Sequence, residues 1–373
     1  MSYFFFSSKL RQSIVLRVFF ICAFFLFVPT FFYALYITIA EIEMPTHPLQ
    51  HVLKHFMIFL LLLISVGGSL AVGLSLLMSK PLLHLEKVMK EIEQGDLYAR
   101  YLPHSLGFEI NHLGYGFNEA MNALIKEKIA KQILDHELKI GREIQKSLFP
   151  SFIPSVKGIK LGAHSYPAKQ VGGDFYDVFT KENTLLITIG DASDKGVGPS
   201  LYSLSVRAML RTLLHRDAAI EETVALTNHL FCQDTKPTSS FVTAWIGYYD
   251  LETKIMKYTN CGHPKSLIIR KGQILDLTTE GIPLGINTSF KPDIKSTILE
   301  EDDLLVLYTD GVLETPNKEG EMFGENRFLN ILLSHHKQPP ENLPDIILKE
   351  IKEFSQQIEL FDDITFLFLK ITR

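Results

Sequence analysis

Residues 187–203 read ITIGDASDKGVGPSLYS, an apolar run followed by a turn with two aspartates, three glycines and one lysine. The apolar run predicts a buried strand, and Asp191 follows it directly. The turn offers carboxylates but no histidine or cysteine. One aspartate at a strand end is ordinarily a turn residue or a helix cap, so the interpretation depends on whether other strands end in the same way.

Three further acidic sites have this layout. Asp310 follows the apolar run LLVLYT, and the pair Asp362 and Asp363 directly precedes ITFLFLKI. Asp174 and Asp177 lie in VGGDFYD, after two glycines. If a pair of sheets brings these strand ends together, the carboxylates repel one another and must either take up protons or bind cations.

The donor types at these sites favour hard divalent ions. No histidine or cysteine stands near them at a spacing typical of zinc sites. Oxygen donors favour magnesium or manganese, and two such ions about 4 Å apart activate a water for in-line attack on a phosphoryl group. The glycines of the turn allow backbone, including the Ala192 carbonyl, to approach a metal beside the Asp191 carboxylate. The pattern therefore predicts phosphoryl hydrolysis without a side-chain nucleophile.

The chain after residue 155 consists of short β-rich runs separated by turn signals. Strands are expected at 185–190, 241–250, 254–260, 265–273, 303–311 and 364–372, and helices at 198–215 and 219–233. Two successive helices between groups of strands favour an α/β layered sandwich over a βαβ repeat.

Two long uncharged runs, 18–40 and 56–79, precede this domain. Each is long enough to cross a bilayer, so residues 1–79 are predicted to form two transmembrane helices, at about 14–40 and 56–79, with a short external loop. A cleaved signal peptide is the alternative for the first run, although that run is too long and lacks a small-residue cleavage site. Lysines and arginines flank the outer ends of both spans, which places both termini and everything after residue 80 in the cytoplasm.

Residues 80–126 read as two amphipathic helices joined by an extended connector, the first opening at Pro81. The GDL at 95–97, the Glu109-Ile110 pair and FNEAM at 117–121 follow at intervals that resemble a HAMP domain. HAMP domains are four-helix signalling modules found just inside many bacterial membranes. The resemblance implies a parallel homodimer.

The helical pattern continues without proline to about residue 149, with apolar residues at helical spacing and charges between them. Residues 127–150 are therefore predicted to form a signalling helix that pairs as a two-stranded coiled coil. One amphipathic helix packed on the next domain is the alternative. Pro150 and Pro154 end the helix and mark the start of a domain that spans 151–373.

Residues 158–373 resemble the metal-dependent, protein phosphatase 2C-like serine/threonine phosphatases. Within that family the segment is most similar to the SpoIIE- and RsbU-like regulators of bacterial sigma factors. The motifs that carry the resemblance are, in chain order, EIQKSLFPSFIP, PAKQVGGDFYD, GDASDKGVGPSL, NCGHPKSLI, GIPLGI, LYTDGVLE and DDITFLFLKI. The resemblance implies a layered αββα sandwich, here preceded by an all-α membrane hairpin, a HAMP four-helix module and a coiled-coil linker.

The resemblance also implies a site with two Mn²⁺ or Mg²⁺ ions. Asp191 would bridge them, with the Ala192 carbonyl on one ion and with Asp310 and Asp362 on the other. Asp174 would be an outer ligand acting through water. Asp191 and Asp310 are then the catalytic residues, because they hold the metal-activated water.

Other residues have less definite expected roles. Asp177 and Asp363 either ligate metal or hydrogen-bond nearby backbone. Lys169 and Lys195 are candidates for binding phosphate, and the alternative is that both are surface lysines. Asp194 stands where the resembled branch usually has glycine, and His263 is expected to be a structural hydrogen-bonding residue more than a general acid.

The predicted function is that of a multi-pass phosphatase of the bacterial inner membrane with a cytoplasmic catalytic domain. The resemblance implies a phosphorylated anti-sigma-factor antagonist, a small STAS-type protein, as substrate. The net charge of −5 argues against a nucleic-acid partner. A sensor kinase is disfavoured because nothing resembles a glycine-rich nucleotide lid, whereas a catalytically inactive scaffold in the same partner-switching pathway stays open as the alternative.

Overall fold

A computed structural model describes residues 24–25, 27–33, 35–37, 39, 49–104, 108–150, 152–216, 218–236, 238–356 and 360–372. The chain divides into two compact units, Met1–Ile133 and Leu134–Arg373. Each unit is described by itself.

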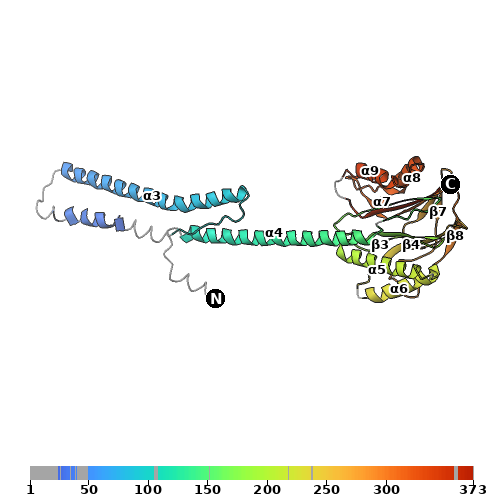
Figure 1. The fold of residues 1–373 in the computed structure, drawn as a ribbon. Helices are drawn as coiled ribbons and strands as arrows, with labels where there is room; N and C mark the ends of the chain where they lie inside the picture. Colours follow the sequence, from blue (N-terminus) through green and yellow to red (C-terminus); the bar gives the residue numbers. More distant parts are fainter. Residues whose placement is uncertain are drawn as a thin grey trace. The chain divides into compact units, whose positions relative to one another are not determined.

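The first unit contains helix α3 (Leu49–Glu93) and the beginning of helix α4 (Phe108–Leu148) (Figure 1). Within α3, Leu53–Gly73 is long and apolar enough to cross a membrane, and none of it is buried inside the structure. The first predicted span, at about 14–40, lies largely outside the described residues. Its described part includes a short apolar helix at Phe27–Ile37.

Helix α3 corrects one expectation, because it passes through Pro81 without ending there. Proline lacks an N–H and disfavours a helix interior, which is why the sequence predicts a new helix at this position. The helix ends at Glu93, where the connector is predicted to begin, and Gly95 follows with a φ of 107° that suits glycine.

The connector after α3 packs closely against α4. Tyr101 is buried with Leu85, Ile110 and Phe117, and the Asn118 side chain bonds both the backbone N–H and the carbonyl of Tyr101. A β-carbon at Gly114 would overlap the Tyr101 ring, so this approach requires glycine.

The second unit is built on two five-stranded antiparallel sheets. The first has the order β1(Ile159–Tyr166), β10(Ile364–Ile371), β9(Leu304–Tyr308), β6(Ser266–Arg270), β7(Gln273–Leu277). The second has the order β2(Phe175–Lys181), β3(Thr184–Ala192), β4(Val242–Asp250), β5(Ile255–Cys261), β8(Lys295–Ile298). The predicted strand at 265–273 ends at Arg270, because Lys271 and Gly272 form the turn of the β6–β7 hairpin.

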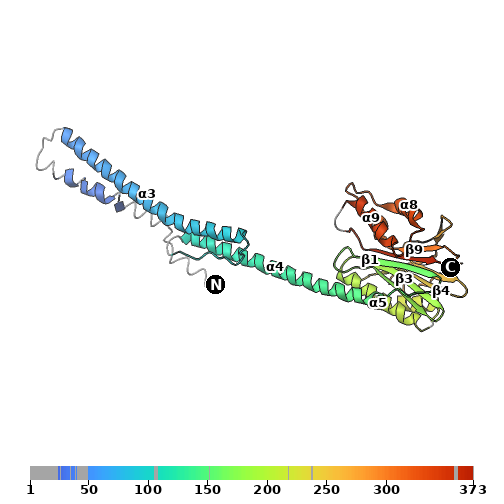
Figure 2. The ribbon, with the colours of Figure 1, turned by 45° about the horizontal axis from the view of Figure 1, so that its top comes forward.

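Helices cover the outer face of each sheet. Helices α5 (Val197–Leu214) and α6 (Ile220–Thr235) pack on the second sheet, and α8 (Gly324–His335) and α9 (Leu343–Ser355) pack on the first. Figure 2 shows α8 and α9 on one side of the strands and α5 on the other. The predicted αββα sandwich is confirmed.

Apolar side chains fill all three interfaces of this sandwich. The central layer between the sheets includes Ile187, Ile189, Trp245, Leu305, Leu307, Leu367 and Leu369. The outer layers include Val206, Leu210, Val224 and Phe231 on one side and Phe328, Leu332, Ile347 and Ile351 on the other. Because β3, β9 and β10 are covered on both faces, they read in the sequence as continuous apolar runs.

Candidate active site

The predicted carboxylates come from both sheets and meet at one end of the sandwich. Asp174 directly precedes β2 and Asp191 is the penultimate residue of β3, both in the second sheet. Asp310 lies just after β9, and Asp362 just before β10, in the first sheet. A hydrogen bond joins the two sheets here, since the Thr309 hydroxyl donates to Asp174 Oδ2 at 2.8 Å.

Glycines allow the backbone turns to approach one another at this end. A β-carbon on Gly173 would lie 2.9 Å from the Ala192 carbonyl oxygen and 3.0 Å from Asp191 Oδ1. A β-carbon on Gly172 would lie 2.5 Å from Asp363 Oδ2. The Ala192 carbonyl therefore lies close to the Asp191 carboxylate. A side chain on residue 173 would press on both groups.

The carboxylates perturb one another strongly. Burial and the repulsion of Asp310 raise the pKa of Asp191 to about 8, although a hydrogen bond with Asp174 opposes the rise. Burial, with the charges of Asp191 and Asp363, raises the pKa of Asp174 well above its usual value. Burial, Glu314 and Asp362 also raise the pKa of Asp310. Burial and mutual repulsion therefore favour the protonated forms of Asp174, Asp191 and Asp310.

These residues fit a hard divalent cation by their chemistry. In the described part of the chain, no three His, Cys, Asp or Glu side chains are grouped so that they would hold one ion by themselves. Magnesium keeps several waters and takes one or two carboxylates, so Asp191, a second carboxylate and the Ala192 carbonyl suffice. A divalent ion would also favour the ionised form of these carboxylates through its positive charge.

Lys195 pairs with one of the carboxylates. Its Nζ lies 2.7 Å from Asp362 Oδ2 and donates to the Phe361 carbonyl at 2.9 Å. The same nitrogen lies 4.3 Å from the centre of the Phe361 ring. Lys195 thus borders the acidic group, whereas Lys169 is exposed and has no ion-pair partner among the described residues.

Asp363 and Asp177 have structural partners. The Asp363 carboxylate accepts hydrogen bonds from the backbone N–H groups of Ala168 and Gly173, each at 2.7 Å. Asp177 is buried between two arginines of α5, at 3.1 Å from Arg207 and 2.6 Å from Arg211. Asp363 therefore shapes the loop beside the carboxylates, and Asp177 ties β2 to α5.

The sequence interpretation missed Gln145, near the end of α4. Its side chain is 6% exposed, its Nε2 donates to the Gly172 carbonyl at 2.7 Å, and its Oε1 accepts from the Gly172 N–H at 3.2 Å. No feature of the spacing marks Gln145, because the residues on either side of it, Ile144 and Lys146, are both exposed.

The family model described as Stage II sporulation protein E (SpoIIE) matches residues 181–372 of this chain. The chain belongs to the SpoIIE family. Strands β3 to β10 lie within the matched range, as do Asp191, Asp310 and Asp362.

Two curated proteins and one solved structure illustrate the similarity of this SpoIIE-family chain. Protein IcfG of Synechocystis is 29% identical over 342 residues, which are 82% of this chain and 54% of IcfG. Phosphoserine phosphatase RsbU of Bacillus subtilis is 26% identical over 295 residues, covering 76% of this chain and 84% of RsbU. The SiaA-PP2C domain of Pseudomonas aeruginosa superposes with a TM-score of 0.59 at 19% identity, covering 65% of this chain and 98% of that domain. The last match shows the shared fold, and this chain spans only about half the length of IcfG.

His263 and Asp194 of this SpoIIE-family domain lie in surroundings that agree with the roles expected from the sequence. Burial lowers the pKa of His263 to about 3, against a hydrogen bond with the Tyr308 backbone that raises it. Its Nδ1 lies 3.0 Å from the Thr243 hydroxyl, and the backbone N–H of His263 donates to Asn260 Oδ1 at 2.7 Å, as a structural residue would. Asp194 has a φ of 72°, which is a backbone conformation that glycine adopts freely.

Proposed function

We propose that this chain is a membrane-anchored, metal-dependent protein serine/threonine phosphatase. The observation that carries the proposal is the meeting of Asp174, Asp191, Asp310 and Asp362, from two sheets, beside the Ala192 carbonyl. The name of the similar RsbU, a phosphoserine phosphatase, supports the same chemistry. Two bound Mn²⁺ or Mg²⁺ ions would supply polarisation of the phosphoryl oxygens and a water of lowered pKa.

Each residue of the proposed site has a distinct role. Asp191, the Ala192 carbonyl, Asp310 and Asp362 would together hold the divalent metal, which would supply a water activated for attack on the phosphate. Asp174 would act through water, with its carboxylate oriented by the Thr309 hydroxyl. Lys195 balances the charge of Asp362 and is a candidate contact for the phosphate.

The proposal gives His263 a structural role and no part in proton transfer. His263 is buried and neutral at physiological pH, so it holds Thr243 in place rather than carrying a proton to the leaving group. Thr243 in turn donates to the Asp191 carbonyl at 3.3 Å. His263 therefore supports the end of β3, where the principal carboxylate lies.

The proposed substrate is a phosphorylated anti-sigma-factor antagonist of the STAS type. The proposal rests on the similarity to RsbU and on the SpoIIE family match. Dephosphorylation would release the antagonist to bind its anti-sigma partner and so free a sigma factor.

The N-terminal part is proposed to tether and regulate this domain. Residues 1–79 would cross the bacterial inner membrane twice, with both termini in the cytoplasm, and 80–126 would form a HAMP module. Residues 127–150 would pair as a coiled coil in a homodimer and lead into the catalytic domain, 151–373. The apolar helix Leu53–Gly73 and the packed connector of α3 and α4 support this arrangement.

The test uses the full chain purified in detergent micelles. We expect release of phosphate from a phosphoserine peptide with Mn²⁺ or Mg²⁺ and none with EDTA. Replacing Asp191→Asn should lower the rate at least about 100-fold, because a direct ligand matters more than the outer-shell partners of a metal. Asp302→Asn, an exposed aspartate in a turn, is the matched control.

Metal binding by calorimetry separates the alternatives. A folded chain that binds Mn²⁺ but releases no phosphate would indicate an enzyme held inactive by its N-terminal half. A chain that binds no Mn²⁺ would contradict the proposal and leave the inactive scaffold.

A further inference from the structure

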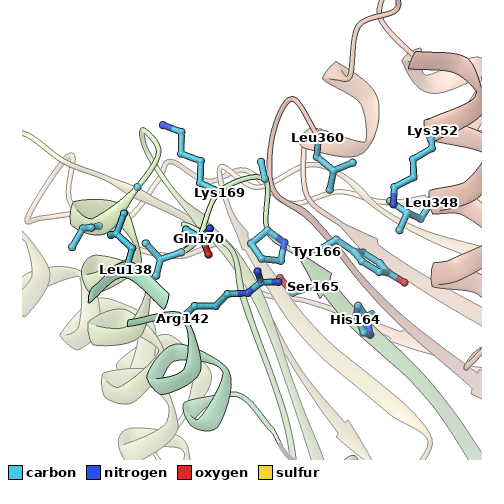
Figure 3. Close-up of a pocket in the computed structure, with 15 residues that line it drawn as sticks. Leu138, Arg142, His164, Ser165, Tyr166, Lys169, Gln170, Leu348, Lys352 and Leu360 are labelled. Atoms are coloured by element: carbon cyan, nitrogen blue, oxygen red, sulfur yellow. The ribbon is translucent and has the colours of Figure 1, made fainter. Parts of the chain in front are cut away.

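A groove beside the carboxylates collects unpaired positive charge. It encloses about 730 Å³ and lies among α4, the loop after β1, the beginning of α5 and α9 (Figure 3). Arg142 comes from α4, Lys169 from the loop and Lys352 from α9. We call this the basic groove.

No described residue that lines the basic groove is acidic. None of Arg142, Lys169 and Lys352 has an ion-pair partner among the described residues, whereas Lys265 and Arg270 each pair with two carboxylates. Asp345 accepts a hydrogen bond from the Tyr166 hydroxyl at 2.5 Å, but it does not line the groove. The groove is therefore complementary to an anionic ligand.

The rest of the lining is largely apolar. Leu138, Tyr166, Val171, Leu348 and Leu360 contribute apolar surface between the charged residues. Figure 3 shows Lys169 and Lys352 on different sides of the groove, with Arg142 below them in this view. Charges that are spread in this way suit an extended ligand with several anionic groups better than one compact phosphate.

The groove is connected to the carboxylates by the chain itself. Its loop continues into Gly172 and Gly173, and the Ala168 N–H in that loop donates to Asp363. Gly196 and Val197 of the lining directly follow Lys195, which pairs with Asp362. A ligand in the basic groove thus lies beside the proposed site of phosphate hydrolysis.

We infer that the basic groove docks an acidic segment next to the phosphoserine of the substrate protein. The inference rests on the proposed function, which supplies the phosphoserine. The apolar lining takes the side chains and stem atoms of the segment, and Arg142, Lys169 and Lys352 contact its carboxylates. The groove would then select protein substrates by their flanking sequence, while the carboxylate site performs the chemistry.

The test measures binding without turnover. Two fluorescent phosphoserine peptides, one flanked by glutamates and one by glutamines at the same positions, are titrated with the full chain in uncharged micelles with EDTA at low salt. We expect the glutamate peptide to bind about five- to tenfold more tightly, with the difference falling as salt is raised. In the double variant Arg142→Gln/Lys352→Gln this preference should disappear, and in Lys169→Gln it should weaken.

Lys139→Gln/Lys337→Gln is the matched control, because both lysines are exposed and neither lines the groove. Equal binding of the two peptides by the unmodified chain would overturn the inference. The inference would also be overturned if the groove variant kept its preference for the glutamate peptide, or if the control variant lost that preference to the same extent. Manganese-dependent hydrolysis of a small phosphate ester by the unmodified chain is measured separately, so that failure of the proposed function is distinguishable from failure of the docking.

Discussion

The side chain of Gln145 makes hydrogen bonds to both backbone groups of Gly172, at 2.7 Å to the carbonyl and 3.2 Å from the N–H. Gly172 belongs to the loop whose next residue, Gly173, lies against Asp191 and Ala192. The end of α4 is therefore fastened to the loop that borders the proposed metal ligands.

Replacing Gln145→Ala should destabilise the domain by about 1–3 kcal/mol, since it leaves two buried backbone groups without partners. We also expect weaker Mn²⁺ binding, because the loop beside Asp191 loses its anchor. Urea unfolding and calorimetry measure the two effects. Gln338→Ala, an exposed glutamine near the end of α8, serves as the control, and a loss of stability with unchanged Mn²⁺ affinity would show that the anchor does not act on the site.

Gly173→Ala should weaken Mn²⁺ binding at least about tenfold, of the order seen when a residue supporting a metal site is changed. The new β-carbon would press on the Ala192 carbonyl and on Asp191 Oδ1, at 2.9 and 3.0 Å. Gly198→Ala is matched to it, because a β-carbon there meets no atom within 4 Å. Calorimetric titration of the two variants decides the matter, and equal affinities would refute the predicted crowding.

Asp177→Asn should cost about 3–5 kcal/mol of stability, the range for removing one partner of a buried ion pair. Arg207 would keep its charge in a site where its side chain is only 10% exposed. We expect the Mn²⁺ affinity to stay within twofold of the original, because Asp177 faces the arginines of α5. A large loss of affinity in the folded variant would instead assign Asp177 to the metal site.

His263 should make the domain less stable in mild acid. Its pKa is about 3 in the folded state and about 6.5 when unfolded, so below pH 6.5 the unfolded chain binds more protons. The resulting loss is up to about 1.4 kcal/mol per pH unit between pH 6 and 4. Asp191 acts in the opposite sense in metal-free protein, because its raised pKa favours protonation of the folded state as pH falls below 8.

The contribution of His263 to the pH dependence of stability is therefore measured as the difference in unfolding free energy between two chains. The unfolding free energies of the original chain and of His263→Gln are compared at pH 7, 6 and 5 in EDTA. We expect the advantage of the original chain to shrink as the pH falls. A pH-independent difference would show that the pKa of His263 is not lowered in the folded protein.

The sequence alone predicts the strand ends that carry Asp191, Asp310 and Asp362. Strands covered on both faces read as unbroken apolar runs, and a carboxylate at the end of such a run stands out. The αββα layering followed from the same runs and from the helices now seen as α5 and α6.

The sequence does not predict the hydrogen-bond and ion-pair partners of other residues, because those partners come from segments far apart in the chain. Lys195 contacts the carbonyl of Phe361, 166 residues away, and Gln145 contacts Gly172, 27 residues away. Asp177 resembles the other aspartates in the sequence, and only its position opposite α5 distinguishes it. Pro81 is typical of a helix start when only its neighbours in the sequence are considered, yet α3 runs through it.

Because the carboxylates come from both sheets, the acidic group is complete only late in synthesis of the chain. Strand β10 lies between β1 and β9, and its entry residues include Asp362 and Asp363. A nascent chain that has emerged only as far as β9 lacks β10, the strand that joins β1 to β9 in the first sheet, and it also lacks Asp310 and Asp362. A ribosome stalled at that point would carry a chain with no assembled site, so a prematurely truncated product should be silent in the cell rather than unregulated.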